Sequence, residues 1–296
     1  MPGVDVHTHL APVLTAELAS QVHGGPPLLQ QPESLVAYLD EVGLDRALVS
    51  PPPPFYRQDV DVAASAVWVA ALNAGVEERC ADHSRLKPVA YLPLEHPELA
   101  ADVYAALRGP GIVVTGAAGG RSQRLDGESF TPLWRMLAED GASLLLHPGT
   151  SQDARLAPHY QENLTGNPLE TTVAASQLVF GQVVTRFAGL RIVLVHCAGA
   201  VPMLAGRWRR GISTSRPGLP EPAVDLDAEL RGIWFDSLSH DAEAMRLAVS
   251  VFGEDRIVMG SDWPFPMGSS NPCADVRALN LFDQAVANGD LVAGVW

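Results

Sequence analysis

Five side chains stand out because each comes at or just after the end of a short apolar run: His7, His9, His147, His196 and Asp262. Imidazole nitrogens and carboxylate oxygens are ligands that divalent transition metals commonly take in proteins. Side chains alternate along a β-strand, so His7 and His9 are expected to share one side of theirs. The pattern therefore predicts a metal site.

Three histidines and one aspartate make a complete site for one divalent ion: His7, His9, His147 and Asp262. This nitrogen-rich set suits zinc, although manganese, iron or cobalt could occupy the same site. Asp262 is also expected to take part in catalysis beside the ion.

His196 has three interpretations: a general acid or base, a fifth ligand, or a buried histidine with a structural role. An imidazole close to a metal-bound water fits the first, because its ordinary pKa lies near neutrality. Asp236 and His240 are either groups that orient the site or ordinary loop residues. Cys197, on the other face of the strand, is expected to pack in the core.

The elements that must position these groups are short β-rich runs alternating with longer helical segments, as in βα units around a parallel sheet. Eight such strands close a barrel, and the carboxyl ends of its strands meet at one face, where active sites form. We expect a single domain over residues 1–296, a distorted (β/α)8 (TIM) barrel. The predicted strands are Val4–His9, Ala47–Pro51, Pro88–Leu94, Ile112–Gly116, Ser143–Pro148, Ile192–Ala198, Ile233–Leu238 and Ile257–Asp262.

Helices are expected between these strands, and the connection Ala11–Pro32 is long enough to cover the site. Two-metal barrel enzymes commonly bridge their ions with a carboxylated lysine on the fourth strand. The single lysine, Lys87, precedes the third strand instead, which favours one ion. The predicted helices are Val60–Ala81, Glu98–Leu107, Phe130–Glu139, Leu169–Phe187, Val201–Ile212, Ala242–Phe252 and Asp275–Asn288.

Composition limits the partners. A net charge of −14 leaves no surplus of cations for nucleic acid or an anionic membrane, and 47% hydrophobic residues supply a large core. No apolar run reaches the ~20 residues of a membrane helix, and the first residues do not resemble a signal peptide. Three scattered cysteines form no disulfide framework. We therefore expect a cytoplasmic protein without nucleic-acid or membrane partners.

Several motifs together resemble the amidohydrolase superfamily, in particular the subfamily of amino-carboxymuconate-semialdehyde decarboxylase. They are Asp5-x-His7-x-His9, Leu146-His147-Pro148, the run from Val195 to Ala200, and Gly260-Ser261-Asp262-Trp263-Pro264-Phe265-Pro266. The resemblance implies a distorted barrel, one zinc ion on His7, His9, His147 and Asp262, and a catalytic role for His196. Phe265 and His240 are expected to contact the substrate.

The resemblance also implies an arginine that binds the substrate carboxylate, eleven residues after the catalytic histidine. Arg207 occupies that position, in a cluster with Trp208, Arg209 and Arg210. In the family this arginine enters the neighbouring subunit's site, which implies a homodimer. The other interpretation is a solvated helix end with favourably placed cations.

Three functions are compatible with these residues. The first is a metal-dependent non-oxidative decarboxylase of a small unsaturated or aromatic carboxylic acid, with metal-bound water and His196 as acid and base. The second is a metal-dependent hydrolase of a lactone or related acid on the same scaffold. The third is a metal-binding protein without activity. Fold alone does not choose between the first two.

Overall fold

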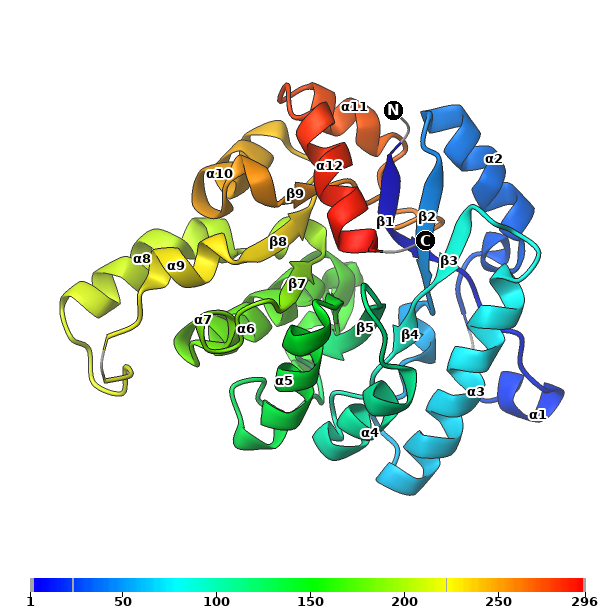
Figure 1. Ribbon diagram of the computed structural model, residues 1–296, viewed down its shortest axis with the longest axis horizontal. Coiled ribbons are helices and arrows are strands. Elements are labelled where there is room, and N and C mark those ends of the chain that lie inside the picture. The colour runs from blue at the N-terminus through cyan, green and yellow to red at the C-terminus, as the bar shows by residue number, and fades with distance from the viewer. Residues whose placement is uncertain (1–2, 23, 222, 295–296) are drawn as a thin grey trace.

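The computed structural model describes residues 3–22, 24–221 and 223–294. Parallel strands form the centre and helices surround them (Figure 1). Consecutive strands pair in chain order within two sheets, one of three strands and one of six. The strands are β1 (Val4–His9), β2 (Arg46–Ser50), β3 (Leu86–Pro88), β4 (Ala90–Tyr91), β5 (Val113–Ala118), β6 (Ser143–Pro148), β7 (Arg191–Leu194), β8 (Ile233–Asp236) and β9 (Ile257–Val258).

Backbone hydrogen bonds join the two sheets into a closed barrel. β3 and β4 are one strand interrupted at Val89, whose N–H donates to the carbonyl of Val49 at 2.8 Å. At the other junction the Val6 N–H donates to the Met259 carbonyl, and Thr8 forms a parallel bridge with Trp263. The eight predicted strands are therefore all present, and the expected distorted (β/α)8 barrel is confirmed.

One cluster of buried side chains fills the interior of the barrel toward the amino ends of the strands. Every strand position of the barrel contributes to it. Its members share an inward direction and are almost all aliphatic, as in the packed interior of such barrels. Val292 and Ala293, at the end of α12 (Phe282–Ala293), belong to the same cluster, and α12 crosses this end of the barrel (Figure 1). The strand residues are Val4, Val6, Leu48, Val89, Val113, Leu145, Val193, Trp234 and Val258.

The helices agree with most of the predicted segments, within a few residues. α10 (Ala242–Phe252) matches its prediction, and α8 (Val201–Ser213) exceeds its own by one residue. The remaining helices that correspond to predictions are α3 (Val62–Cys80), α4 (Pro97–Leu107), α5 (Thr131–Asp140), α6 (Asn167–Phe180), α7 (Val183–Arg186), α11 (Pro272–Arg277) and α12.

Several boundaries and elements were predicted wrongly. Leu169–Phe187 is not one helix, because Gln182 adopts a left-handed backbone (φ 53°) between α6 and α7. Asp275–Asn288 is likewise divided, between α11 and α12. The prediction missed α2 (Pro32–Val42), which starts with proline at its first position and ends at Gly43 with φ 77°. It also missed the short helices α1 (Ala16–Ala19) and α9 (Leu226–Arg231).

The described residues of the connection Ala11–Pro32 do not line the site, contrary to expectation. Its described residues line a separate cavity of about 580 Å³ beside Phe55 and Arg79. Arg79 donates to the carbonyls of Ala11 and Gln30, which attaches this connection to α3.

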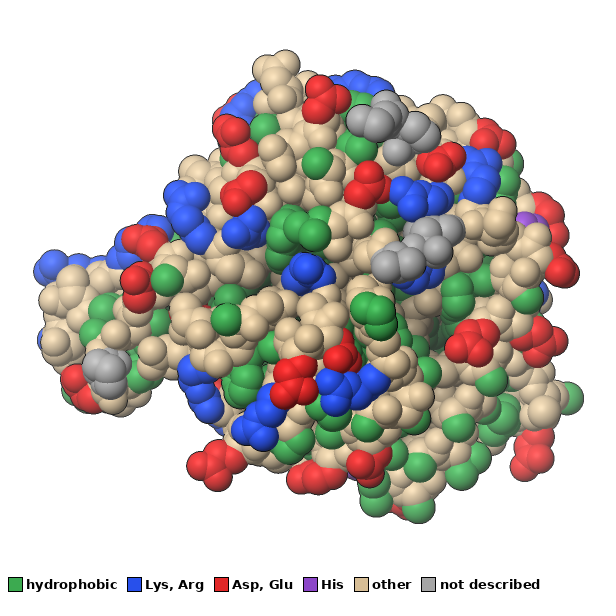
Figure 2. All heavy atoms as spheres, in the orientation of Figure 1, with side chains coloured by type: hydrophobic (Ala, Val, Ile, Leu, Met, Phe, Trp, Pro, Cys, Tyr) green, Lys and Arg blue, Asp and Glu red, His purple; other side chains and the backbone are tan. Residues whose placement is uncertain are grey.

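No helix among the described residues is both long enough and apolar enough to cross a membrane. Acidic and basic side chains are interspersed on the face shown in Figure 2.

Candidate metal and catalytic site

The two histidines of β1 reach the site through an irregularity in their strand. The register between β1 and β2 shifts between Asp5 and Thr8. Val6 consequently joins the interior cluster while the next side chain, His7, reaches the polar end of the barrel. Adjacent residues of a regular strand point to opposite faces, so Val6 and His7 could not both point into the barrel without this shift. The shift therefore allows the apolar interior and the metal site to lie next to each other on one strand.

His147 lies in β6, as predicted, but His196 and Asp262 lie beyond the ends of the strands on which they were predicted. β7 ends at Leu194, and the turn that follows takes positive φ at His196 (54°), Cys197 (52°) and Ala198 (60°). Asp262 (φ 59°) similarly lies four residues beyond β9. Such conformations are uncommon for residues other than glycine and recur at functional sites.

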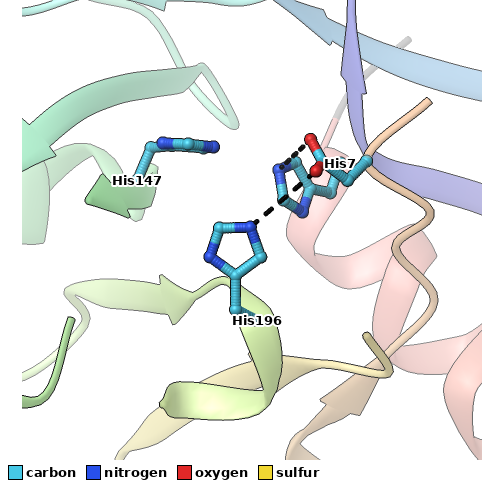
Figure 3. A group of neighbouring side chains, drawn as sticks. His7, His147 and His196 are labelled. Atoms are coloured by element: carbon cyan, nitrogen blue, oxygen red, sulfur yellow. Dashed lines mark ion pairs between the residues drawn. The ribbon is translucent and has the colours of Figure 1, made fainter. Parts of the chain in front are cut away.

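The structure nevertheless brings the predicted groups together at the carboxyl end of the barrel, and Figure 3 shows three of them, His7, His147 and His196. The ring of His7 lies 5.1–5.3 Å from those of His9, His147 and His196, measured between centroids. The Asp262 carboxylate is among them, with Oδ1 at 3.1 Å from His9 Nε2 and 3.4 Å from His7 Nε2.

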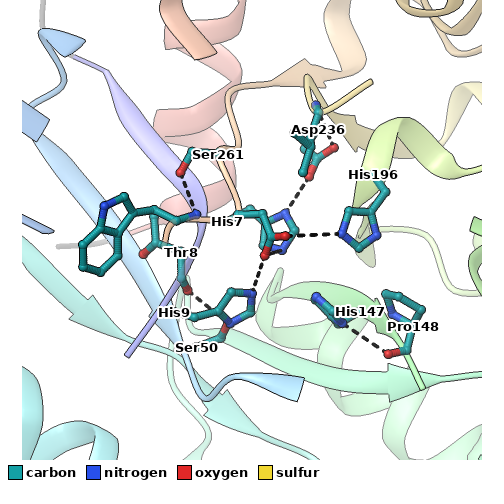
Figure 4. A network of polar contacts seen from close by, with 12 residues as sticks. His7, Thr8, His9, Ser50, His147, Pro148, His196, Asp236 and Ser261 are labelled. Atoms are coloured by element: carbon teal, nitrogen blue, oxygen red, sulfur yellow. Dashed lines mark hydrogen bonds and ion pairs between the residues drawn. The ribbon is translucent and has the colours of Figure 1, made fainter. Parts of the chain in front are cut away.

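Oxygen atoms lie beside Nδ1 of three of these histidines, and Figure 4 shows two of the contacts, His7 with Asp236 and His147 with Pro148. His7 Nδ1 lies 2.8 Å from Asp236 Oδ2, while His9 Nδ1 and His147 Nδ1 each lie 3.2 Å from a backbone carbonyl, of Pro51 and Pro148 respectively. A nitrogen that donates to an oxygen carries the hydrogen, so Nε2 of each ring keeps a free lone pair.

Those three Nε2 atoms and Asp262 Oδ1 are buried and have no hydrogen-bond partner among the described residues. Buried polar atoms normally have a partner, so four such electron-pair donors in one place indicate a site that can bind a cation. The donor set fits a divalent metal ion, with imidazole orientation controlled through the opposite nitrogen. These are the four residues predicted as ligands.

A second grouping is also possible on distance. His7, His147, His196 and Asp262 each offer one ligand atom within 4.8 Å of the others. His196 differs from the other three histidines, however, because its Nδ1 has no partner among the described residues, and its Nε2 lies 3.9 Å from Asp262 Oδ2. Its tautomer is therefore not imposed by an acceptor, which suits a group that exchanges protons.

Burial and neighbouring charges set the protonation of the site. Burial lowers the pKa of His9 and lowers that of His147 well below its usual value, so both are neutral, as ligands must be. Burial also lowers the pKa of His7, but the hydrogen bond to Asp236 and the charge of Asp262 outweigh it and raise the pKa. Burial acts to raise the pKa of Asp262, yet the contacts with His196 and His9 hold it well below its usual range.

Asp236 orients two parts of the site at once. Its Oδ2 accepts from His7, while its Oδ1 accepts from the Cys197 N–H at 2.8 Å and the Leu238 N–H at 3.2 Å. It thereby holds the turn that carries His196 against β1. The interpretation of Asp236 as an orienting group is supported. Cys197 is buried in the core as expected, but it lies in the turn after β7 and not on the strand.

A cavity of about 490 Å³ opens above these residues. His147, His196 and Asp262 line it, together with two of the predicted substrate contacts, Phe265 and His240. The Phe265 ring also meets His9 edge-on, with centroids 5.4 Å apart. The described chain does not bring Arg207 to this cavity: that residue is exposed on α8, which extends outward from the barrel (Figure 1).

The prediction missed one side of the cavity wall. Asn163 and Leu164, in the π-helical turn Glu162–Gly166, line it with Asn167. No role was predicted for these residues, since their signal in the sequence is weak: two asparagines four positions apart, between the predicted strand Ser143–Pro148 and the predicted helix Leu169–Phe187. A π-helical turn is itself frequent at functional sites but cannot be recognised from one sequence.

Comparison with known proteins is consistent with this geometry. A 2-amino-3-carboxymuconate-6-semialdehyde decarboxylase of Dictyostelium discoideum is 30% identical over 178 residues, which are 59% of this chain and 49% of that protein. The chain's match thus spans about half that relative's length. A 6-methylsalicylic acid decarboxylase of Penicillium expansum is 24% identical over 282 residues, covering 89% of this chain and 85% of the relative.

Among solved structures, 5-carboxyvanillate decarboxylase of Novosphingobium aromaticivorans superposes with a TM-score of 0.75 at 18% identity. The superposition covers 99% of this chain and 94% of that one, which supports the barrel fold along the whole molecule. The amidohydrolase family model matches residues 4–290, from the first strand of the barrel to the helix that crosses its end. The chain therefore belongs to the amidohydrolase family, as the motifs suggested.

Proposed function

We propose that the protein is a metal-dependent non-oxidative decarboxylase of a small aromatic or unsaturated carboxylic acid. The observation that carries the proposal is the convergence of Asp262 Oδ1 and three histidine Nε2 atoms, all buried and without a hydrogen-bond partner among the described residues, beneath a cavity lined by His196. The names of the relatives from Dictyostelium and Penicillium support carbon–carbon bond cleavage over the other functions considered.

The reaction requires that the bond between the substrate carbon and its carboxylate breaks and that its electron pair stays on the carbon. His7, His9, His147 and Asp262 would hold a divalent ion, which would supply positive charge where negative charge develops. His196 lines the cavity and is free to deliver the proton that replaces carbon dioxide. Phe265 and His240 contact the substrate body from the same cavity.

We infer one ion per chain, with zinc as the metal that best suits this ligand set. Manganese is the main competitor, because the solved 5-carboxyvanillate decarboxylase of Novosphingobium aromaticivorans is complexed with that ion. Metal analysis of the protein as isolated, followed by reconstitution of the chelated protein with each ion, tests this proposal. Two tightly held ions per chain would refute it.

The decisive assay is carbon dioxide release from a panel of aromatic and muconate-type acids, with ring opening or lactone hydrolysis followed in parallel. In the His196→Ala variant we expect the metal to stay and turnover to fall ~10²–10⁴-fold, the usual contribution of a positioned acid or base. Loss of the metal would make His196 a ligand instead. Hydrolysis without carbon dioxide release would favour the metal-dependent hydrolase.

We further propose a homodimer in which Arg207 of each copy binds the substrate carboxylate in the other copy's cavity. Arg207 is exposed on the outward-reaching α8, and three exposed apolar side chains surround the cavity mouth: Tyr160, Leu164 and Met203. Apolar rims of this kind suit a partner surface. A guanidinium also matches a carboxylate with two parallel hydrogen bonds.

Complementation between variants tests the shared site. Arg207→Ala should raise KM strongly at unchanged metal content, and mixing it with His196→Ala should restore part of the activity through heterodimers. A protein that is monomeric and fully active at assay concentration would exclude the shared site.

The cytoplasmic location remains part of the proposal, and it is supported by the unpaired, buried cysteines Cys80, Cys197 and Cys273.

A further inference from the structure

The charge of the cavity wall limits what the substrate can carry besides its reacting carboxylate. Among the described residues that line the cavity there is no lysine or arginine, and Asp262 is the only carboxylate. Much of the remaining wall is apolar, including Pro53, Leu238, Leu247 and Met267. A second carboxylate on the substrate would therefore be desolvated without a lysine or arginine of this chain to pair with, which is costly.

Two neutral polar side chains occupy one side of the wall. Asn163 lies in the π-helical turn and Asn167 at the first position of α6, four residues later, so both fall on the same side of the continuous helical segment. Both are partly buried and line the cavity. No hydrogen bond of the described chain uses either side-chain amide, although the Asn167 backbone carbonyl accepts from Thr171.

An amide offers N–H donors and a carbonyl acceptor but no charge. It can pair with a hydroxyl, methoxy or amino substituent, and it cannot neutralise a carboxylate. Sites that pair with a substrate hydroxyl discriminate strongly against analogues that lack it, because their own polar groups are then left unpaired.

We propose that Asn163 and Asn167 determine specificity by selecting ring acids with one carboxylate and a neutral hydrogen-bonding substituent over dicarboxylic acids. The inference rests on the proposed function, in which the metal end of the cavity and Arg207 of the other copy both engage the single reacting carboxylate, so that this arginine is not available to a second one. The two asparagines then contact the substituent on the rest of the ring.

Binding to the metal-loaded protein tests this with a readout other than activity. Three matched pairs of probes cover the ring positions: 2-, 3- and 4-hydroxybenzoate against benzene-1,2-, 1,3- and 1,4-dicarboxylate, with benzoate as reference. By calorimetry we expect at least one hydroxybenzoate to bind ~10-fold or more tightly than both benzoate and its dicarboxylate counterpart.

Replacement of the amides should remove this preference selectively. Asn163→Leu and Asn167→Leu should bring the favoured hydroxybenzoate to within ~2-fold of benzoate while benzoate binding persists. Asn163→Arg adds a cation and should tighten dicarboxylate binding by ~10-fold or more. Glu162→Gln is the matched control, because Glu162 is in the same turn and does not line the cavity.

The inference is overturned if wild-type protein binds a dicarboxylate as tightly as the best hydroxybenzoate, or if both leucine variants keep the hydroxyl preference. Carbon dioxide release from dicarboxylic acids alone would likewise refute it while leaving decarboxylation intact. The expected binding preference without carbon dioxide release from any acid would instead refute the proposed function and support the assignment of the two asparagines.

Discussion

The two ends of the barrel are built on the same strands but bury opposite kinds of side chain. At the amino end, Val4, Val258 and Val292 form an apolar plug with α12. At the carboxyl end, His7, His147 and other polar groups are buried with atoms that lack hydrogen-bond partners among the described residues. Apolar burial contributes stability at one end, whereas unsatisfied polar burial costs stability at the other unless a ligand is present.

This contrast explains how one fold can be stable and still maintain a reactive site. The strands are anchored by the plug and by their ladders, so their carboxyl ends can hold polar groups in fixed positions. The positive φ values at His196 and Asp262 lie at the functional end. Conformations of this kind persist where the surrounding structure over-determines them.

The largest effect is expected from removal of a ligand. Asp262→Ala deletes the only anionic donor among the proposed ligands, so metal content should fall from about one ion per chain to a small fraction. Activity should fall ~10³-fold or more, because the ion supplies several kcal/mol of charge stabilisation. Elemental analysis after dialysis measures this. His240→Ala, which changes the same cavity without removing a ligand, should keep its metal; retention by Asp262→Ala would disprove the ligand assignment.

A buried acid outside the metal site should give the next largest effect. Glu95 follows β4, is 6% exposed, and has no partner for either carboxylate oxygen among the described residues. Burial raises its pKa from 4.5 to about 7. The folded state therefore prefers the protonated acid, so its stability contribution is present below pH 4.5 and is lost as the pH rises through about 7.

Glu95→Gln should remove that dependence. At pH 8 we expect the free energy of unfolding to rise by up to ~3 kcal/mol relative to wild type, with little change near pH 4.5. Urea unfolding of the metal-free protein at both pH values measures it. Glu77→Gln, on an exposed position of α3, is the control. Equal effects of Glu95→Gln at both pH values would show that its charge is not the cause.

A smaller effect is expected when the orienting group is changed. Asp236→Asn can still accept from the Cys197 N–H, but its amide would donate toward His7 Nδ1. The hydrogen of His7 would move to Nε2, the atom proposed to bind the metal. We expect metal affinity to fall ~10–100-fold with the fold intact. Competition with a chelator measures the metal affinity. Asp227→Asn, at an exposed position of α9, is the control. Unchanged metal affinity in Asp236→Asn would contradict the tautomer argument.

The smallest effect should come from the apolar end and should spare the metal. Val292 is fully buried, and Val292→Ala should lower the free energy of unfolding by ~2 kcal/mol through lost burial and a residual cavity. Its neighbour Leu291 is 48% exposed, so Leu291→Ala should change stability far less. Denaturant unfolding and metal titration separate the two quantities. A loss of metal affinity in Val292→Ala would show that the ends are coupled.

The sequence alone determined the parts of this protein that depend on local pattern. Short aliphatic runs between helical segments indicated eight strands and a barrel, because strand burial follows from residue type and period. The five polar groups after those runs identified the proposed metal and catalytic residues, since parallel strands must gather their carboxyl ends. The helix α2 was missed altogether, although proline at its first position is a usual signal of a helix start.

Only the tertiary structure decided how those residues are oriented. The acceptor that determines the His7 tautomer lies 229 residues away on β8, and that of His9 is a backbone carbonyl after β2. The turns that follow β7 and β9 likewise depend on left-handed conformations that no local propensity dictates at His196 or Asp262. The same holds for the isolation of Glu95 and the common wall formed by Asn163 and Asn167. Each of these features depends on which residues, distant in the sequence, surround a side chain. Local sequence patterns do not specify those neighbours, which are set only when the chain packs.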